Sequence, residues 1–101
     1  MNSIKTQHAP SPITGYVLNS TNAGVPGAVV SIFNSSGQRV ATRVTDITGF
    51  FFFGKTSMLT TGSTYTAKIV FLPEGYSVVM PSQQSFQWTN APTPLMNFSV
   101  R

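Results

Sequence analysis

Charged residues are scarce in this sequence. Asp, Glu, Lys and Arg make up 8% of its 101 residues, against roughly a quarter in an average globular domain. Solubility must therefore depend on Ser, Thr, Asn and Gln, and neutral polar surfaces of this kind are typical of secreted and surface β-domains. The few cations form no run, whereas proteins that bind nucleic acid concentrate Lys and Arg in a patch. We therefore expect no nucleic-acid partner.

Only two of the cations lie close together. Arg39 and Arg43 are four positions apart. Because side chains alternate across a strand, this spacing predicts that both arginines lie on one face. The default role of such a pair is to form a solvated basic face.

Cysteine and long apolar runs are absent. Without cysteine the chain has neither a disulfide framework nor thiolate chemistry. No apolar run approaches the ~20 residues of a membrane-spanning helix, so no membrane insertion is expected. The segment from Met1 to Ser11 also lacks the apolar stretch of a signal peptide. We expect either a mature fragment with an added Met or a protein that is made and assembled without that export route.

Titratable groups suited to catalysis are few. The one histidine is His8, and the two acids are Asp46 and Glu74. A hydrolase triad would need His8 beside Asp46, and a glycosidase would need the two carboxylates as a pair, but both acids sit in predicted turns. Two acids far apart in sequence also cannot form the oxygen cage that calcium requires. The sequence therefore predicts no enzyme, no metal site and no cofactor.

What the sequence has instead is a series of short β-type segments. Runs of β-branched and aromatic residues alternate with Gly, Pro, Asn and Ser, which is the pattern of a sandwich or small barrel. This pattern predicts one all-β sandwich domain of seven or eight strands over residues 13–101, preceded by a flexible or extended arm over residues 1–12. The expected strands cover residues 13–19, 28–34, 38–45, 50–53, 65–72, 76–80, 85–88 and 95–100.

Four segments, in their order along the chain, resemble a known family. They are Ile13 to Val17, Val25 to Val30, Thr45 to Phe53, and Tyr65 followed by the stretch from Pro73 to Tyr76. The sharpest of them is the Thr-Asp-x-x-Gly-x-Phe-x-Phe pattern that begins at Thr45. Together they are similar to the carboxypeptidase regulatory-like and B-type surface-repeat superfamily. The resemblance implies a prealbumin-like Greek-key sandwich without catalytic activity, used as a spacer or building block in adhesins, pili, surface layers or multidomain secreted enzymes.

Two chemistries of that family can be checked residue by residue. Some members form an internal Lys–Asn isopeptide bond between the first and last strands, beside an acid. Asn97 occupies the last strand here, but the first strand has no lysine, and Glu74 follows Pro73 in a turn. We therefore expect no isopeptide bond. Other members bind calcium through acid-rich loops, which this chain lacks.

The run of four phenylalanines is the most informative stretch. Side chains alternate across a strand, so at most two of the four can face the core. The family register puts Phe51 and Phe53 inside and leaves Phe50 and Phe52 pointing outward. Leaving two such side chains in water costs ~1.5–3 kcal/mol each compared with full burial, so a cover is expected. The arm, the segment 81–88 or a neighbouring subunit could provide it.

The arm is long enough to contact an adjacent copy. Ile4 could fill an apolar site there, or the arm could add a strand to an open sheet edge, with Pro10 and Pro12 as a stiff joint. Such a head-to-tail contact does not close on itself and would build a filament. The other interpretation of the arm is a disordered terminus.

The sequence therefore favours a non-catalytic structural module, a subunit or spacer of an extracellular or cell-surface filament or adhesin. Its partners would be copies of itself or neighbouring domains. The expected assembly surface comprises Ile4, Pro10, Pro12, Phe50 and Phe52. The side chains expected to stabilise the fold by burial between the sheets are Val30, Ile32, Phe51, Phe53, Ile69 and Phe98.

Two alternatives stay open at this point. The first is a module that binds carbohydrate or a protein receptor through exposed aromatics, for which the candidates are Tyr16, Tyr76 and Trp88. A sugar site of this kind would be a flat aromatic platform flanked by Asn and Gln. The second alternative is an accessory domain of a larger secreted protein.

Overall fold

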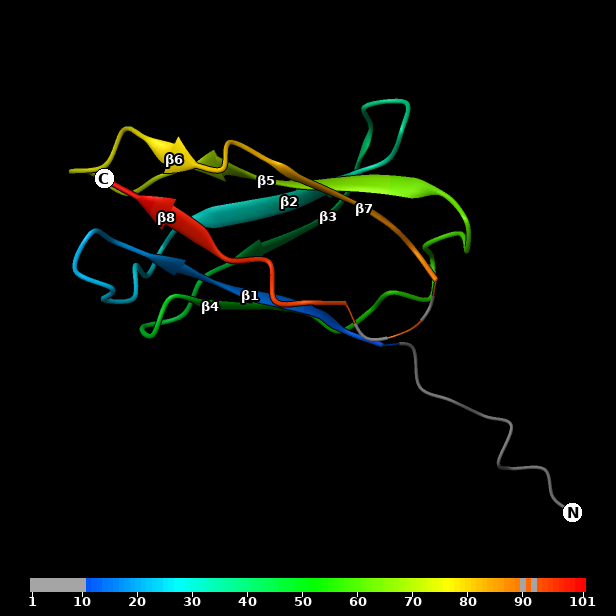
Figure 1. The fold of residues 1–101 in the computed structure, drawn as a ribbon, viewed down its shortest axis with the longest axis horizontal. Coiled ribbons are helices and arrows are strands. Elements are labelled where there is room, and N and C mark those ends of the chain that lie inside the picture. Colours follow the sequence, from blue (N-terminus) through cyan, green and yellow to red (C-terminus); the bar gives the residue numbers. More distant parts are fainter. Residues whose placement is uncertain (1–10, 90, 92) are drawn as a thin grey trace, which may run out of the picture.

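The computed structural model describes residues 11–89, 91 and 93–101. These residues form eight β-strands and no helix, which confirms the predicted all-β class (Figure 1). In this described part of the chain, no helix is long and apolar enough to cross a membrane. The strands are β1 (Ile13–Leu18), β2 (Val29–Phe33), β3 (Arg39–Val44), β4 (Phe50–Phe53), β5 (Thr64–Phe71), β6 (Val79–Met80), β7 (Gln84–Gln87) and β8 (Phe98–Val100).

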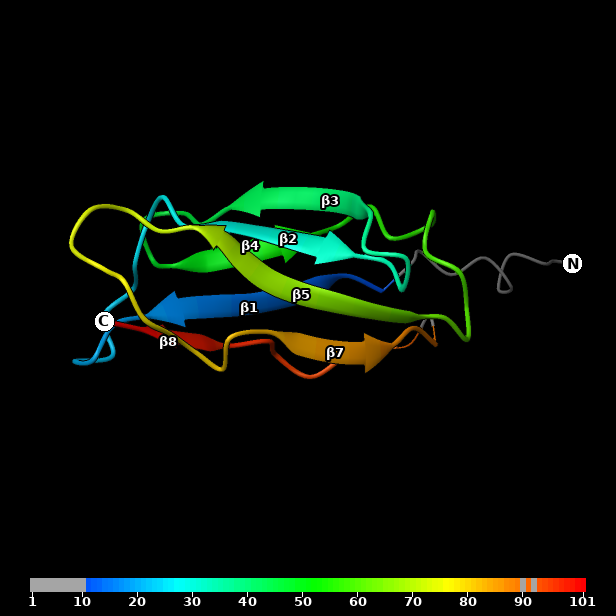
Figure 2. The ribbon, with the colours of Figure 1, turned by 90° about the horizontal axis from the view of Figure 1, so that it is seen from above.

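The strands form two sheets that face each other as two layers (Figures 1 and 2). The β1 sheet has the order β4-β1-β8-β6, and the β2 sheet has the order β3-β2-β5-β7. Neighbouring strands are antiparallel except β1 and β8, which run parallel. Most neighbours are not consecutive in the chain, and this non-sequential order is that of a Greek-key sandwich.

Two of the connections between the sheets join edge strands. At one edge β3 leads into β4 through residues 45–49, and at the other edge β6 leads into β7. Thr45 fixes the connection from β3 to β4, because its buried hydroxyl donates to the Val25 carbonyl at 2.6 Å and accepts the Ala28 N–H at 3.0 Å. Both polar functions of this hydroxyl are thus satisfied, as burial requires.

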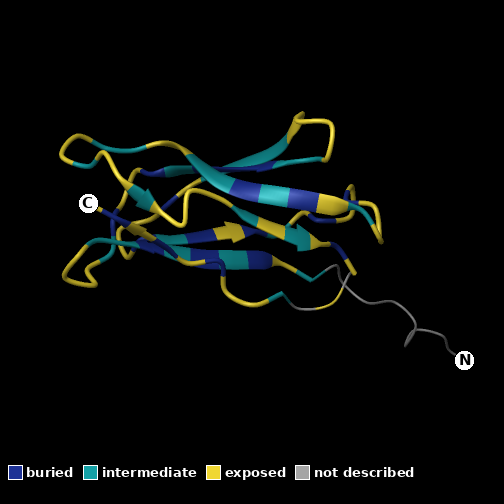
Figure 3. Ribbon diagram, turned by 45° about the horizontal axis from the view of Figure 1, so that its top comes forward, coloured by how far each residue is buried: buried dark blue, intermediate teal, exposed yellow. Residues whose placement is uncertain are grey.

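The core lies between the sheets and is built largely by alternation. Every second residue of β1 is buried, and β4, β8 and the first half of β5 also alternate (Figure 3). Strand β2 instead has three consecutive buried residues, and β3 at the edge has none. In β4, Phe51 and Phe53 are buried whereas Phe52 is exposed. Of the predicted core residues, all are buried except Ile69, which is half-buried and packs against the core.

A β-bulge in β3 shows that the prediction for the two arginines is wrong. Arg43 pairs with the buried Val30, whereas Arg39 pairs with Phe33, which faces outward. The register shift between these pairs adds one residue to β3, so the two arginines point to opposite faces. The Arg43 guanidinium lies 5.4 Å from the centroid of the Phe53 ring in the other sheet, where it covers the side of the sandwich between β3 and β4.

The last strands are shorter than the sequence predicts. β6 has 2 residues and β8 has 3. Before β8, Met96 turns its side chain into the core and donates its N–H to the Thr14 carbonyl at 2.9 Å. Residues 95–97 therefore lie beside β1 without forming a continuous ladder.

Candidate assembly surface

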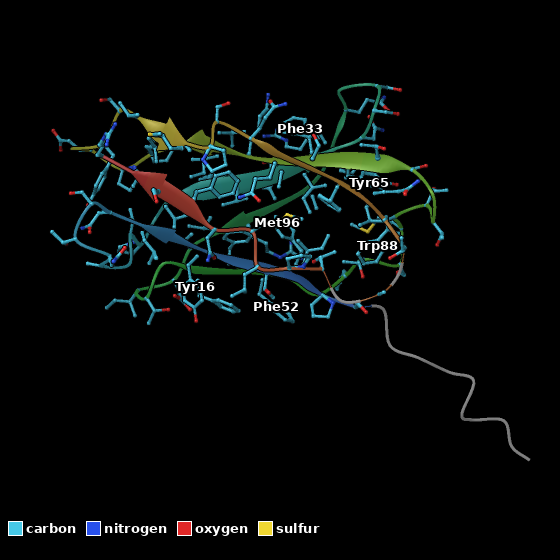
Figure 4. The ribbon with its side chains drawn as sticks, viewed as in Figure 1. Tyr16, Phe33, Phe52, Tyr65, Trp88 and Met96 are labelled. Atoms are coloured by element: carbon cyan, nitrogen blue, oxygen red, sulfur yellow. The ribbon has the colours of Figure 1, made fainter. Side chains whose placement is uncertain are left out.

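The outer face of the β1 sheet carries three aromatic side chains, Tyr16, Phe50 and Phe52, here called the aromatic row. Tyr16 of β1 lies directly opposite Phe50 of β4. The ring centroids of Tyr16 and Phe50 are 5.1 Å apart, and those of Phe50 and Phe52 are 6.4 Å apart. Figure 4 shows Tyr16 and Phe52 on the side of the β1 sheet that faces away from the β2 sheet. Because Phe51 and Phe53 are buried, the predicted register of β4 is confirmed.

Phe52 is the most exposed member of the aromatic row. It is 50% exposed, whereas Tyr16 and Phe50 are half-buried. The Phe52 ring lies against Gly54, where an added Cβ would be 2.6 Å from a ring carbon. An exposed phenylalanine that continues a row of aromatic rings forms an apolar patch rather than an isolated side chain, and such patches mark interaction surfaces.

The turn before β4 positions the aromatic row. The Asp46 Oδ1 atom accepts the Thr48 N–H at 2.8 Å, the Thr48 hydroxyl at 2.6 Å and the Phe50 N–H at 3.1 Å. The Asp46 N–H in turn donates to the Phe50 carbonyl at 3.0 Å. These bonds form an Asx-type turn that fixes the first residue of β4. The strand therefore enters the sheet in one register, with Phe50 outward.

The same hydrogen bonds set the acidity of Asp46. The Thr48 hydroxyl, together with the N–H groups of Thr48 and Phe50, lowers the pKa of the Asp46 carboxyl below its ordinary value of 3.8. Desolvation acts in the opposite direction and is outweighed. The carboxylate thus acts as a structural acceptor for the turn.

Gly49 is required by this turn for two reasons. Its φ is +79°, and an added Cβ would lie 2.4 Å from the Val17 carbonyl oxygen. The Gly49 carbonyl also accepts the Val17 N–H at 2.8 Å, which holds the turn tightly against β1. Glycine alone combines the left-handed backbone with such a close approach. This geometry explains why the sequence pattern pairs Asp46 with a glycine at this position.

The predicted assembly residues are only partly described. Pro12 is exposed and directly precedes Ile13, which pairs with Phe53 of β4. Pro12 therefore lies next to the strand pair at the end of β4. Ile4 and Pro10, and most of the predicted arm, lie outside the described residues.

Of the covers that the sequence left open for the outward phenylalanines, residues 81–88 do not provide one. Strand β7 in this segment pairs with β5, so it belongs to the β2 sheet, in the other layer. Phe52 consequently keeps half of its surface exposed. The arm and a neighbouring subunit stay open as predicted covers.

Trp88 was predicted as an exposed ligand aromatic, and this is wrong. It is 1% exposed and lies in the core at one end of the sandwich (Figure 4). Its backbone extends the pairing of β5 and β7, with the Trp88 N–H donating to the Ser63 carbonyl at 2.9 Å and the Gly62 N–H donating to the Trp88 carbonyl at 2.7 Å. This continued alternation puts Trp88 on the same inner face as Phe86, which packs against the core.

The other two predicted ligand aromatics do not form a platform with Trp88. Tyr16 belongs to the aromatic row on the outer face of the β1 sheet. Tyr76 is half-buried against the core, and its hydroxyl accepts a hydrogen bond from the Asn19 amide at 3.5 Å. The three side chains lie in different environments, so the sugar platform predicted from them is not formed.

Asn97 has a structural role on the outer face. Its Oδ1 atom accepts the N–H of Tyr16 at 2.9 Å, and Asn97 is exposed. The flanking Met96 and Phe98 are the buried residues of this segment. The asparagine therefore ties the last strand to β1 beside the aromatic row and does not enter the space between the sheets.

A second set of exposed apolar side chains was not predicted. Val44 is 60% exposed and Phe71 is 58% exposed, and both pair with Val29 on the outer face of the β2 sheet. Simple alternation would have placed Phe71 on the same face as Ile69. A register shift in the pairing of β2 with β5 adds one residue and turns Phe71 outward.

Comparisons with known proteins identify the fold. No family model and no curated protein matches the chain. Among solved structures, the chain is similar to the Bacillus anthracis TIE protein, with a TM-score of 0.62 and 19% identity over 88% of this chain and 17% of that one. It is also similar to a C-terminal fragment of the pilus adhesin SpaC from Lactobacillus rhamnosus GG, with a TM-score of 0.58 and 15% identity over 90% of this chain and 44% of the fragment.

An iodide-soaked crystal of the SpaC fragment gives a TM-score of 0.54 at 15% identity, over 89% of this chain and 43% of the fragment. The chain thus spans less than half the length of each of these structures. At such identities the likeness shows a shared fold. The sandwich is therefore one that also occurs in a pilus adhesin, while membership of the carboxypeptidase regulatory-like superfamily stays a prediction.

Proposed function

We propose that this chain is a non-catalytic structural module, a subunit or spacer of a cell-surface or extracellular filament or adhesin. It associates with copies of itself or with neighbouring domains through the aromatic row and residues 1–12. The observation that carries this proposal is the half-exposed Phe52 at the end of a row of aromatic rings. A cell-surface location is supported by the pilus adhesin among the structures that share the fold.

Burial of the aromatic row supplies the driving force for association. Apolar surface gains about 25 cal/mol for each Å² removed from water, so covering Phe52 and its neighbours favours a bound state. Thr14 and Asn97, which lie beside the rings, are neutral. Contact at these residues therefore needs no charge to be desolvated, which keeps its cost low.

The positions of the acids support a role without catalysis. Asp46 uses one carboxylate oxygen for three hydrogen bonds within its own turn. Glu74 is exposed in the turn after β5. In the described part of the chain, no group of three His, Cys, Asp or Glu side chains is placed to hold a metal ion. Paired titratable groups are the usual basis of acid–base catalysis, and these two acids serve separate turns.

Size-exclusion chromatography and electron microscopy of the intact chain and of a chain lacking residues 1–12 test this proposal. The intact protein is expected to associate as its concentration rises, and the truncated protein is expected to elute as a monomer. Thermal unfolding of the truncated protein serves as the control that it remains folded. Monomeric elution of both proteins over a wide concentration range would contradict the proposal.

A further inference from the structure

A pocket of about 260 Å³ lies on the outer face of the β2 sheet, on the opposite layer from the aromatic row. It is formed where the end of β2, the β2–β3 hairpin loop, the middle of β5 and the start of β7 meet. The side chains that line it, here called the Phe33 pocket, are Phe33, Asn34, Ser35, Thr66, Lys68 and Gln83.

Strand register brings the aromatic ring and the cation of this pocket together. Phe33 is paired with Thr66, and Lys68 is paired with Ser31, two residues before Phe33 on the same face of β2. The Lys68 ammonium consequently lies 4.8 Å from the centroid of the Phe33 ring. Figure 4 shows Phe33 on the side of the β2 sheet that faces away from the core. A cation at this distance is attracted to the ring face and is held over it.

The Lys68 ammonium is available for an anionic ligand. The two acids of the chain lie elsewhere, Asp46 in the turn before β4 and Glu74 in the turn after β5. Among the described residues, the contact of the Lys68 ammonium is therefore with an aromatic ring and not with a carboxylate. A partly buried ammonium without a carboxylate partner gains more from a ligand carboxylate than a paired one does.

The wall of the pocket is preformed by the hairpin loop. The Asn34 Oδ1 atom accepts the Ser36 N–H at 3.0 Å and the Gln38 N–H at 2.9 Å. The Asn34 Nδ2 atom donates to Gln38 Oε1 at 3.1 Å, and the Gly37 N–H donates to the Asn34 carbonyl at 2.9 Å. Asn34 is thus occupied in shaping the loop, and a rigid loop reduces the entropy lost when a ligand binds.

The remaining polar groups of the pocket are neutral. Ser35 offers a hydroxyl and Gln83 offers an amide, each of which can both donate and accept hydrogen bonds. The Thr66 hydroxyl already shares a hydrogen bond of 3.0 Å with the Ser85 hydroxyl. Such groups suit a ligand with several hydroxyls. One cation beside one aromatic ring suits a ligand that carries a single carboxylate next to an apolar C–H face. The volume, just below the range of drug-sized ligand sites, suits one sugar ring.

We propose that the Phe33 pocket binds one acidic sugar unit, a uronic acid in a carbohydrate chain. The carboxylate pairs with the Lys68 ammonium, the C–H groups of the sugar pack against the part of the Phe33 ring that Lys68 leaves uncovered, and the hydroxyls bond to Ser35 and Gln83. This site lies on the other sheet from the aromatic row and does not depend on the proposed assembly.

Calorimetry and NMR titration of the intact chain at low salt test the site, with methyl β-D-glucuronide as the probe and methyl β-D-glucoside as the neutral comparison. The glucuronide is expected to bind weakly, with a Kd of about 1 mM. Its amide shifts should centre on residues 33–37, 66–68 and 83. The glucoside should bind at least about fivefold more weakly, because it lacks the ion pair.

Lys68→Gln should weaken glucuronide binding by about fivefold, to the level of the glucoside, because it removes the ion pair. Lys55→Gln is the matched control, since Lys55 is an exposed lysine outside the pocket, and it should leave binding unchanged. Phe33→Leu should weaken both sugars, with thermal unfolding used to confirm that the variant folds. Absence of binding to the wild-type chain, equal binding of both sugars, or equal effects of the two lysine variants would overturn the proposal.

A carboxylate of a second copy is the other occupant that the pocket could take. In that case Glu74→Gln would reduce self-association as strongly as Lys68→Gln does, and the wild-type chain would not bind the glucuronide. That outcome would overturn the sugar assignment. If the sugar assignment is correct, Glu74→Gln leaves both glucuronide binding and self-association unchanged.

Discussion

Asp46 and Gly49 hold the start of β4, and the direction of the aromatic row depends on them. The Asp46 carboxylate accepts hydrogen bonds from the N–H groups of Thr48 and Phe50. Gly49 allows the turn to approach the Val17 carbonyl. Neither residue takes part in the row, but both determine that Phe50 begins the strand facing outward. The Asp-x-x-Gly pattern that begins at Asp46 therefore positions the apolar side chains of β4.

Replacement of Asp46 should lower the stability of the fold in a pH-dependent way. The pKa of its carboxyl is lower in the folded state than the ordinary value of 3.8, so ionised Asp46 stabilises the fold above that value. The contribution is lost as the pH falls through the lowered pKa. Thermal unfolding of the wild type, Asp46→Asn and Asp46→Ala across acidic pH measures this effect.

Asp46→Asn keeps an acceptor oxygen, so it should retain much of the turn and show a weaker acid dependence than the wild type. Asp46→Ala removes the acceptor and should unfold at a lower temperature at neutral pH. Equal melting temperatures for all three proteins at neutral pH would show that the turn does not depend on this side chain.

Gly49→Ala should destabilise the fold more than Gly37→Ala. Both glycines have a positive φ, +79° and +83°, so each substitution carries a backbone cost of about 1–3 kcal/mol. A Cβ at Gly49 would in addition meet the Val17 carbonyl oxygen, whereas a Cβ at Gly37 meets nothing within 4 Å. Urea unfolding of the two variants measures the difference, and equal losses would contradict the close packing of the turn against β1.

Strand β4 divides its four phenylalanines between two functions. Phe51 and Phe53 face the core, with ring centroids 5.9 Å apart, and Phe51 also packs against Phe98 of β8 at 6.4 Å. Phe50 and Phe52 face outward beside Tyr16. One strand therefore anchors the sandwich with one face and presents an apolar surface with the other.

Substitutions along β4 should alternate in their effect on stability. Phe51→Ala leaves a cavity in the core and should cost about 3–5 kcal/mol of unfolding free energy. Phe52→Ala removes a half-exposed ring and should cost less than about 1.5 kcal/mol. Chemical denaturation of the monomeric proteins measures both. Similar losses for the two variants would contradict the register described here.

Alternation predicted the elements well wherever the strands are regular. The positions of Phe51, Phe53 and Val30 follow from period-two reasoning. The same reasoning fails at a bulge, because one extra residue moves every later side chain of the strand to the opposite face. This happens in β3 and β5. The faces of Arg43 and Phe71 were therefore not predictable from spacing. Burial of Trp88 depends on pairing between distant segments, which a single sequence does not reveal.

The outer faces of the two sheets differ in the polarity of their side chains. The β1 sheet carries the aromatic row, which is apolar and uncharged. The β2 sheet carries Lys68 and hydroxyl side chains toward one end and Val44 with Phe71 toward the other. Unequal faces of this kind favour heterologous contacts between copies, and such contacts build open chains when they do not close.

Phe52→Gln should reduce self-association, whereas Phe71→Gln should not. Both phenylalanines are about equally exposed, at 50% and 58%, so the two substitutions change overall surface hydrophobicity to a similar extent. Sedimentation velocity over a concentration series compares them. Loss of association in both variants would indicate that association depends on overall surface hydrophobicity and not on a defined surface. Loss in Phe71→Gln alone would assign the contact to the β2 sheet.

The most direct test of the account is a map of the surface that is covered when the protein associates. Amide NMR spectra of the labelled intact chain, recorded over a concentration series, report this surface residue by residue. The account predicts that the amides of residues 14–16 and 50–54 shift or broaden together as the concentration rises, while those around Phe71 stay unchanged. Spectra that do not change with concentration, or changes confined to the β2 sheet, would contradict it.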